Sequence, residues 1–282
     1  MVCACFLFFC RKLEMKKIFI PLVFLLPLLQ LLFRRGNDLS IYDAAQWWEA
    51  DSPFRILRKM NVVRVPYFLA HADFHNPLLV LDVGCGGGFV SEELALASPG
   101  SRVVGIDISQ SSISQAALHA NEAGIPESRL QYIVGSIYKL PYADNSVDVV
   151  IASDVFEHLD RLDLALTEIF RVLKPKSGIL LFDTIAKSWW SWLSTYFVAQ
   201  QVLGLVVDGA HDWDLFVSAD TMHALLVNGG FRDYDISSWK GIVADLNLFN
   251  AISANSIHEL ISGFRPSDSD LSANYMGFAR KR

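Results

Sequence analysis

Short apolar runs alternate with longer amphipathic segments through the middle of the chain, from residue 78 to residue 182. Runs of about five apolar residues between polar or glycine residues are typical of buried parallel strands, and apolar residues recurring every three or four positions are typical of helices that cover a sheet. The predicted strands are residues 78–83, 102–106, 130–134, 147–152 and 179–182, and the predicted helices between them are residues 92–97, 112–123 and 160–173. This alternation predicts an α/β fold with helices on both faces of a parallel sheet.

The last third of the chain has a less regular pattern. Residues 216–227 are predicted to form a helix, which two glycines end. Residues 234–237 and 272–278 are predicted to supply the last two strands of a seven-stranded sheet. Residues 243–267, between these two strands, are interpreted as an insertion near the pocket.

The segment before the first strand, residues 38–71, looks helical. It contains an aromatic cluster of Tyr42, Trp47 and Trp48, followed by Arg55, Arg58 and Arg64. Aromatic residues at this spacing are usually part of a hydrophobic core. The pattern alone therefore favours core packing for this cluster.

The first predicted strand runs into a glycine-rich loop that holds Gly84, Gly86 and Gly88. The dinucleotide-binding fingerprint needs a sixth-position glycine, and that position is Phe89 here. Asp107 ends the second strand, 23 residues after Gly84, where an acid can accept hydrogen bonds from ribose hydroxyls. The loop alone is compatible with a purely structural turn, but loop and acid together predict a site for a nucleoside cofactor that is not a dinucleotide.

An acidic group with a histidine follows the fourth predicted strand. Asp154, Glu157 and His158 stand at positions i, i+3 and i+4, which one helical turn would place on one face. Such a face can ligate a divalent cation of the magnesium, manganese or zinc type. In the alternative interpretation, the acids only complement the positive end of the helix predicted at 160–173, and the histidine packs beneath it.

Two apolar segments are candidates for contact with lipid. Residues 18–33 are apolar apart from one glutamine, with basic pairs on both sides, but they fall short of the ~20 residues that span a bilayer. We therefore expect residues 1–36 to be a membrane anchor or a targeting segment, and residues 37–282 to form the folded domain. Residues 188–207 hold three tryptophans and no charge, so they suit either a lid at the bilayer interface or a buried helix over the sheet.

Charge and cysteine content narrow the class of protein further. Residues 1–35 have a net charge of +5, so the rest of the chain must carry −11 to give the overall −6. Such an acidic body argues against a nucleic-acid substrate. Three of the four cysteines lie before residue 11 and the fourth, Cys85, lies in the glycine loop. This distribution gives no disulfide framework and is compatible with a reducing compartment, although the first three could be acylated beside an anchor.

These motifs together resemble a known family. The glycine loop with Asp107 resembles the class I S-adenosylmethionine-dependent methyltransferases. Several further motifs resemble, in the same order, the ubiquinone-biosynthesis O-methyltransferases: Trp47-Trp48, Asn61-Val62-Val63-Arg64, the acidic group with His158, Gly209-Ala210-His211-Asp212-Trp213 and Asn274-Tyr275-Met276. The chain departs from the family at Val62, where a proline is usual, and at Asp154, which replaces the first glutamate of an E-x-x-E-H metal motif.

The resemblance implies a Rossmann-like methyltransferase fold and a set of site residues. S-adenosylmethionine would be bound by Arg64, from the helical segment before the first strand, and by residues in or after the strands, namely Asp82, Gly84, Gly86, Gly88, Asp107, Ile108, Ser136, Ile137 and Ser153. The metal motif implies that Asp154, Glu157 and His158 hold Mg²⁺ or another divalent cation. His158 and His211 are the candidate catalytic residues, because a histidine beside a carboxylate can take a proton from a phenol.

The family also implies a function, which is methylation of a phenolic hydroxyl on a polyprenylated benzenoid in ubiquinone biosynthesis. The implied partners are that substrate, a membrane surface and other quinone-biosynthesis enzymes. The implied location is a membrane, the mitochondrial inner membrane in a eukaryote. Two alternatives stay open on the sequence: a methyltransferase for another small or lipidic acceptor, and a non-catalytic cofactor-binding subunit of a membrane complex.

Overall fold

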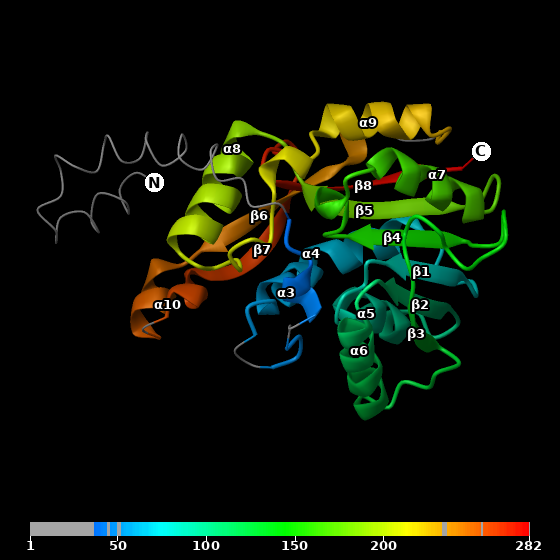
Figure 1. The fold of residues 1–282 in the computed structure, drawn as a ribbon, viewed down its shortest axis with the longest axis horizontal. Coiled ribbons are helices and arrows are strands. Elements are labelled where there is room, and N and C mark those ends of the chain that lie inside the picture. Colours follow the sequence, from blue (N-terminus) through cyan, green and yellow to red (C-terminus); the bar gives the residue numbers. More distant parts are fainter. Residues whose placement is uncertain (1–36, 44–45, 50–51, 233–235, 255, 282) are drawn as a thin grey trace, which may run out of the picture. The chain divides into compact units, whose positions relative to one another are not determined.

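The computed structural model describes residues 37–43, 46–49, 52–232, 236–254 and 256–281. The anchor or targeting segment predicted for residues 1–36 lies outside the described residues. One eight-stranded sheet runs through the described part, with the strand order β3-β2-β1-β4-β5-β8-β6-β7 (Figure 1). The α/β class predicted from the alternating pattern is therefore confirmed.

Five strands form the parallel part of the sheet. They are β1 (Leu79–Val83), β2 (Arg102–Asp107), β3 (Leu130–Val134), β4 (Val149–Ser153) and β5 (Ile179–Ile185). Neighbours pair in parallel throughout, with Val80 opposite Val103 and Val149, for example. Because parallel strands all end at one edge of the sheet, the glycine loop and the residues that follow β2, β4 and β5 meet there.

The C-terminal part of the sheet differs from the prediction. β8 (Asn274–Arg280) pairs antiparallel with β5, β6 (Lys240–Leu246) pairs with β8, and β7 (Ile261–Ser267) forms the edge. Of the strand predicted at 234–237, residues 234 and 235 lie outside the described residues; its second half is wrong, because Ile236–Ser238 form a 3₁₀ turn and the strand begins at Lys240.

The predicted insertion, residues 243–267, contributes a complete strand, so the sheet has eight strands rather than seven. Strand β7 carries Pro266, which lacks an N–H to donate, and the partly exposed Arg265. Both residues suit an edge strand, where one row of backbone groups faces away from the sheet. The mixed composition that led us to interpret this segment as an insertion is thus the composition of an edge strand.

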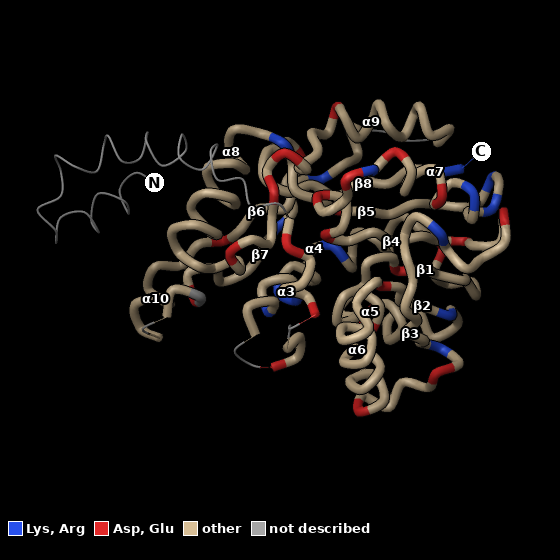
Figure 2. The backbone as a smooth tube through the Cα atoms, viewed as in Figure 1, with Lys and Arg blue, Asp and Glu red and all other residues tan. Residues whose placement is uncertain are grey.

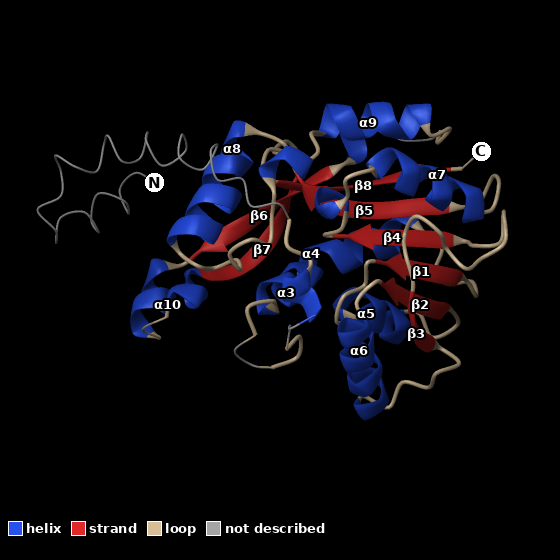
Figure 3. Cartoon of the chain, in the orientation of Figure 1, coloured by secondary structure: helices blue, strands red, loops and turns tan. Residues whose placement is uncertain are grey.

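Helices cover both faces of the sheet (Figures 1 and 3). On one face, apolar residues of α4 (Arg55–His71), α5 (Phe89–Ala97) and α6 (Gln110–Glu122) pack on Val80, Val103 and their neighbours. On the other face, α7 (Leu162–Val172) and α9 (Ala219–Asn228) pack on a cluster that includes Leu81 and Val104. Adjacent residues of one strand therefore belong to different cores, as the two-residue period of a strand requires.

Three further helical segments lie outside these two layers. α3 (Ser40–Asp43) precedes α4, α8 (Trp189–Ser191) continues as the π-helix Trp192–Val202, and α10 (Leu248–Ser253) connects β6 to β7. Few charged residues mark α8 and α10 in Figure 2. Trp189 and Phe249 are about three-quarters exposed, at 74% and 76%, while Phe197 and Gln200 of the π-helix are buried. The segment 188–207 is therefore partly exposed and partly buried.

Across the part of the chain that the structure describes, no helix combines the length and the apolar character needed to cross a bilayer.

Candidate functional site

The glycine loop after β1 has a backbone that only glycine adopts readily. Gly84, Gly86 and Gly88 have φ angles of +70°, +51° and +85°, in the left-handed region that penalises side chains. A Cβ on Gly84 would collide with Val155, and a Cβ on Gly86 would lie 2.6 Å from the Trp47 ring. The loop is thus closely packed between the turn after β4 and Trp47.

Asp107 ties this loop to the end of β2. Its carboxylate accepts hydrogen bonds from the backbone N–H groups of Gly86 and Ser109, both at 2.8 Å. Burial raises the pKa of Asp107, against the lowering effect of these hydrogen bonds. The next residue, Ile108, has 60% of its surface exposed. The predicted pair of glycine loop and acid is therefore in contact at the carboxyl edge of the sheet.

Asp82 lies inside the protein behind the loop. Its side chain is almost fully buried and accepts a hydrogen bond from the Ser91 hydroxyl at 2.5 Å. Burial raises the pKa of Asp82 to about 6. In the described structure this carboxylate joins β1 to α5.

Ser136 and Ile137, predicted to contact the cofactor, follow β3 at the same edge of the sheet. The hydroxyl of Ser136 accepts a hydrogen bond from the Tyr138 backbone N–H at 3.2 Å. Ile137 is buried in the core beneath α7. Ser136 thus stands at the sheet edge, and the Ile137 side chain packs inward.

Arg64 reaches this edge from α4 and is the centre of a buried charge network. It is 2% exposed, and its Nη1 donates to the Ser153 hydroxyl at 2.6 Å. The same nitrogen lies 2.7 Å from Oδ2 of Asp154 and 3.7 Å from Oδ2 of Asp183. The Ser153 hydroxyl in turn donates to Asp183 Oδ1 at 2.5 Å. Residues from α4, β4 and β5 are thereby joined at one point.

Acidic groups outnumber basic groups in this network. Asp154, Asp183 and Glu157 surround the single guanidinium of Arg64. Burial raises the pKa of Asp183 to about 7 and that of Glu157 well above its usual range. Glu157 Oε1 has no hydrogen-bond donor among the described residues. The site is therefore suited to a ligand that brings positive charge or proton donors.

Replacing Asp183 with Asn is expected to change how stability depends on pH. The pKa of this carboxyl rises from 3.8 to about 7 on folding, so between these values the folded chain keeps a proton that the unfolded chain has released. Its contribution to stability is complete below the unfolded pKa and is lost as the pH rises through the folded pKa. From urea denaturation, the unfolding free energy of wild type relative to Asp183→Asn should fall by up to about 1.4 kcal/mol per pH unit in this window. A difference that stays constant with pH contradicts the proposed burial of this acid.

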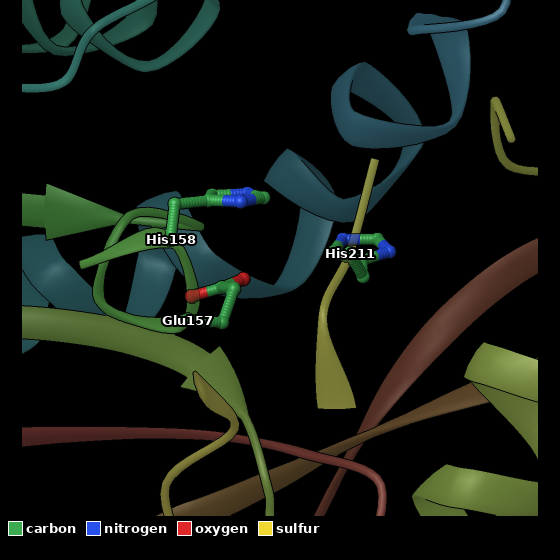
Figure 4. Close-up of side chains that lie close together, drawn as sticks. All are labelled: Glu157, His158 and His211. Atoms are coloured by element: carbon green, nitrogen blue, oxygen red, sulfur yellow. The ribbon is translucent and has the colours of Figure 1, made fainter. Parts of the chain in front are cut away.

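A second group of side chains lies beside the charge network. One ligand atom each from Glu157, His158 and His211 falls within 4.8 Å of the others. Figure 4 shows these side chains facing a shared space, with His211 on a separate segment from the other two. Glu157 Oε2 accepts a hydrogen bond from the Thr184 hydroxyl at 2.6 Å, and Nδ1 of His211 lies 3.1 Å from Oε1 of Gln200.

The helical turn predicted for Asp154, Glu157 and His158 is wrong. Asp154 has a left-handed φ of +50°, and only Phe156–His158 form a 3₁₀ turn after it. This bend directs the Asp154 carboxylate to Arg64 rather than to His158. His211, from a loop far along the chain, takes the third place in the cluster.

His158 is held by Asn37 and Tyr42, which lie near the start of the described residues. The Asn37 amide donates to the His158 carbonyl oxygen at 3.2 Å, and Asn37 Oδ1 lies 3.0 Å from Nδ1 of the ring. The Tyr42 hydroxyl lies 3.2 Å from Nε2. Burial, and next to it the neighbouring His211, lowers the pKa of His158 to about 3, and burial lowers that of His211 to about 4. Both imidazoles are therefore neutral at neutral pH.

Sequence reasoning missed four of these residues. Asp183 left a weak signal, as an acid inside an apolar strand at the carboxyl edge of the sheet. Asn37, Tyr42 and Gln200 left no signal, because their partners lie elsewhere in the chain, 121 residues away in the case of Asn37. Tyr42 instead matched the pattern of a core aromatic residue.

Comparisons with known proteins define the class. The family model "Methyltransferase domain" matches residues 81–182. A SAM-dependent methyltransferase from Aquifex aeolicus superposes with a TM-score of 0.52 at 18% identity, covering 80% of this chain and 97% of that chain. Geranyl diphosphate C-methyltransferase from Streptomyces coelicolor, in a complex that includes S-adenosyl-L-homocysteine, gives 0.54 at 17% identity, covering 77% and 78%. With the glycine loop and Asp107, the fold is that of a class I methyltransferase that uses S-adenosylmethionine.

Sequence relatives identify the family. Ubiquinone biosynthesis O-methyltransferase from Rickettsia felis is 32% identical over 203 residues, covering 71% of this chain and 79% of the relative. The protein of that name from Idiomarina loihiensis is 32% identical over 236 residues, covering 83% and 87%. The mitochondrial protein from Rattus norvegicus is 33% identical over 198 residues, covering 66% and 56%. The chain belongs to the ubiquinone biosynthesis O-methyltransferase family, which confirms the resemblance seen in its motifs.

Proposed function

We propose that this protein methylates a phenolic hydroxyl of a polyprenylated benzenoid in ubiquinone biosynthesis, with S-adenosylmethionine as the donor. One observation carries the proposal. The imidazole of His158, neutral at neutral pH, contacts the phenolic side chain of Tyr42, whose ring stacks on Trp47 beside the glycine loop. Candidate residues for binding the methyl donor and for binding the methyl acceptor thus lie at one edge of the sheet.

The donor is proposed to be held by the glycine loop, Asp107, Arg64 and Ser153. The glycines of the loop have no Cβ, so a ligand can approach the loop backbone closely. The Asp107 carboxylate is fixed by two backbone N–H groups and can accept further hydrogen bonds. The Arg64 guanidinium keeps Nε without a hydrogen-bond partner among the described residues. When bound, S-adenosylmethionine supplies an electrophilic methyl group. These residues fit a ligand with ribose hydroxyls and a positively charged group, because acids outnumber bases around Arg64.

Asn37 decides which nitrogen of His158 carries the hydrogen. Because its amide nitrogen donates to the His158 carbonyl, its amide oxygen faces Nδ1. An amide oxygen only accepts, so Nδ1 carries the hydrogen and Nε2 keeps a lone pair. We propose that Nε2 accepts the proton of the acceptor hydroxyl while the hydroxyl oxygen receives the methyl group.

A divalent cation at Glu157, His158 and His211 remains a proposal. Two imidazoles and one carboxylate suit zinc or manganese better than magnesium, which prefers oxygen ligands. Both nitrogens of His158 already have partners, so a cation on Nε2 has to displace the Tyr42 hydroxyl, and it takes the lone pair that otherwise accepts the proton. A cation at this place is therefore an alternative to proton transfer to His158. Asp154, engaged with Arg64, is left out of this donor set.

We expect His211→Ala to weaken Mn²⁺ binding by about tenfold or more, because losing a ligand costs at least as much as losing a residue that only orients one. Asp154→Asn should leave the affinity unchanged. Isothermal titration of the full chain with Mn²⁺ measures both. If Asp154→Asn abolishes binding and His211→Ala does not, the ion is held instead by Asp154, Glu157 and His158, the ligands predicted from the sequence motif.

Membrane contact is proposed on the basis of the uncharged segments. Residues 188–207 and 246–258 lack charged residues and hold exposed large apolar side chains, including Trp189, Trp190 and Phe249. Tryptophan favours the bilayer interface, where a prenylated acceptor resides. In a eukaryote we propose the mitochondrial inner membrane; the rat relative is named as mitochondrial. Association with other quinone-biosynthesis enzymes also stays a proposal.

A panel of acceptors tests the function. Full-length protein and labelled S-adenosylmethionine are incubated with a short-tailed dihydroxy polyprenylbenzoate, with the same compound after both hydroxyls are methylated, and with a fatty acid. The proposal predicts label only in the dihydroxy compound. Label in the fatty acid moves the acceptor to another class, and tight donor binding without any labelled product favours a non-catalytic subunit.

A further inference from the structure

The hydroxyl of Tyr42 is a phenol bound inside the site of a protein that acts on phenols. It lies 3.2 Å from Nε2 of His158, and Asn37 leaves this nitrogen with a lone pair, so the tyrosine donates. The ring of Tyr42 is stacked on Trp47 with centroids 6.0 Å apart, and lies 5.5 Å from the ring of Phe54. His158 meets it edge-on at 5.6 Å.

The surroundings of Tyr42 belong to the candidate site. Burial raises the pKa of its hydroxyl above the usual range, and Glu157, Asp154 and Asp107 raise it further. The tyrosine therefore keeps its proton at neutral pH. The same three acids contribute to the charge network, the histidine cluster and the glycine loop, so Tyr42 stands where these groups meet.

We propose that the ring and hydroxyl of Tyr42 occupy the place of the acceptor's ring and hydroxyl, and that the acceptor displaces them from His158. This inference rests on the proposed function and adds to it the position of the phenol. Trp47 and Phe54 then become walls for the acceptor ring, and Nε2 of His158 becomes its hydrogen-bond acceptor.

Displacement of Tyr42 is compatible with how α3 is held. Within α3, Ser40 and Asp43 are exposed, and Ile41 and Tyr42 are half-buried. A few hydrogen bonds hold the segment, such as those from the Asp38 backbone to Gly209 and from the Ser112 hydroxyl to the Tyr42 carbonyl, at 3.0 and 3.1 Å. A segment with so few buried contacts opens at low cost.

The hydroxyl of Tyr42 competes with the acceptor in this proposal, so removing it should tighten acceptor binding. Full-length protein saturated with S-adenosyl-L-homocysteine is titrated with 3,4-dihydroxybenzoate by calorimetry. We expect Tyr42→Phe to bind about fivefold more tightly than wild type, the effect of one hydrogen bond that no longer has to be broken. Tyr67→Phe is the matched control, because within the described part of the chain its hydroxyl also has one hydrogen-bond partner, the Ser238 carbonyl at 3.4 Å; its affinity should equal that of wild type.

A double mutant separates this role from simple packing. In a His158→Phe background the imidazole lone pair is gone, so adding Tyr42→Phe should bring no further gain. Equal or weaker binding by Tyr42→Phe, or a gain that persists without His158, overturns the proposal. The titration needs no turnover, so a gain in Tyr42→Phe without methyl transfer supports this position for the phenol and counts against the proposed function alone.

Discussion

Replacing Arg64 with Met is expected to have the largest effect on stability of any single substitution in the site. The guanidinium is the only cation that contacts Asp154 and Asp183 among the described residues. The substitution therefore removes the positively charged partner of both acids. Breaking a buried ion pair from one side typically costs about 3–5 kcal/mol, because a charge is left buried without compensation. Urea denaturation at pH 8 measures the loss, and binding of S-adenosyl-L-homocysteine should be lost as well.

Two comparisons isolate the cause of that loss. Arg161→Met removes an ion pair with Asp163 whose side chains are more than half and about half exposed, at 59% and 50%, and such exposed pairs contribute little to stability. Adding Asp183→Asn to Arg64→Met should restore part of the stability, since one uncompensated acid disappears. An Arg64→Met variant as stable as Arg161→Met contradicts the buried network.

Gly86→Ala is expected to have the second largest effect. The alanine has to adopt a φ of +51°, which costs about 1–2 kcal/mol. Its Cβ also meets the ring of Trp47 at 2.6 Å, and overpacking of this kind costs about 1–3 kcal/mol more. Because the Gly86 N–H holds the Asp107 carboxylate, we expect the affinity for S-adenosyl-L-homocysteine to fall by about tenfold or more, an energy of about 1.4 kcal/mol.

Two other glycines provide controls for the backbone cost of a positive φ and for the contact of the added Cβ with Trp47. Gly124 has a φ of +72° with no atom within 4 Å of an added Cβ, so Gly124→Ala carries only the backbone cost. Gly100 has open space and no positive φ, so Gly100→Ala should leave stability and binding unchanged. If Gly86→Ala behaves as Gly124→Ala does in both measurements, the contact between Trp47 and the loop has no role in donor binding.

The sequence predicted the parallel half of the fold closely. The bounds of β3 match the prediction at both ends, and those of β2 differ by one residue, because short apolar runs between polar residues leave little choice of register. Strand β7 escaped notice because it mixes Gly263, Arg265 and Pro266, which an edge tolerates and a buried strand does not.

The site was harder to predict than the fold. The glycine loop and Asp107 follow from local sequence, since a strand, a turn and a second strand place them together. The expected triad of acids and histidine assumed continuous helix, and the left-handed φ of Asp154 broke that assumption. Contacts such as that of Tyr42 with His158 join segments that are far apart in the sequence, and the hydrophobic pattern along the chain does not predict such contacts.

The most direct test of the account is transfer of a labelled methyl group from S-adenosylmethionine to a short-tailed 3,4-dihydroxy-5-polyprenylbenzoate by the full-length protein, with the product analysed by NMR. The account predicts a single new O-methyl group on a ring hydroxyl and loss of the product in His158→Ala at unchanged donor binding. Tight donor binding with no methylated product, or a methyl group on carbon, would contradict it.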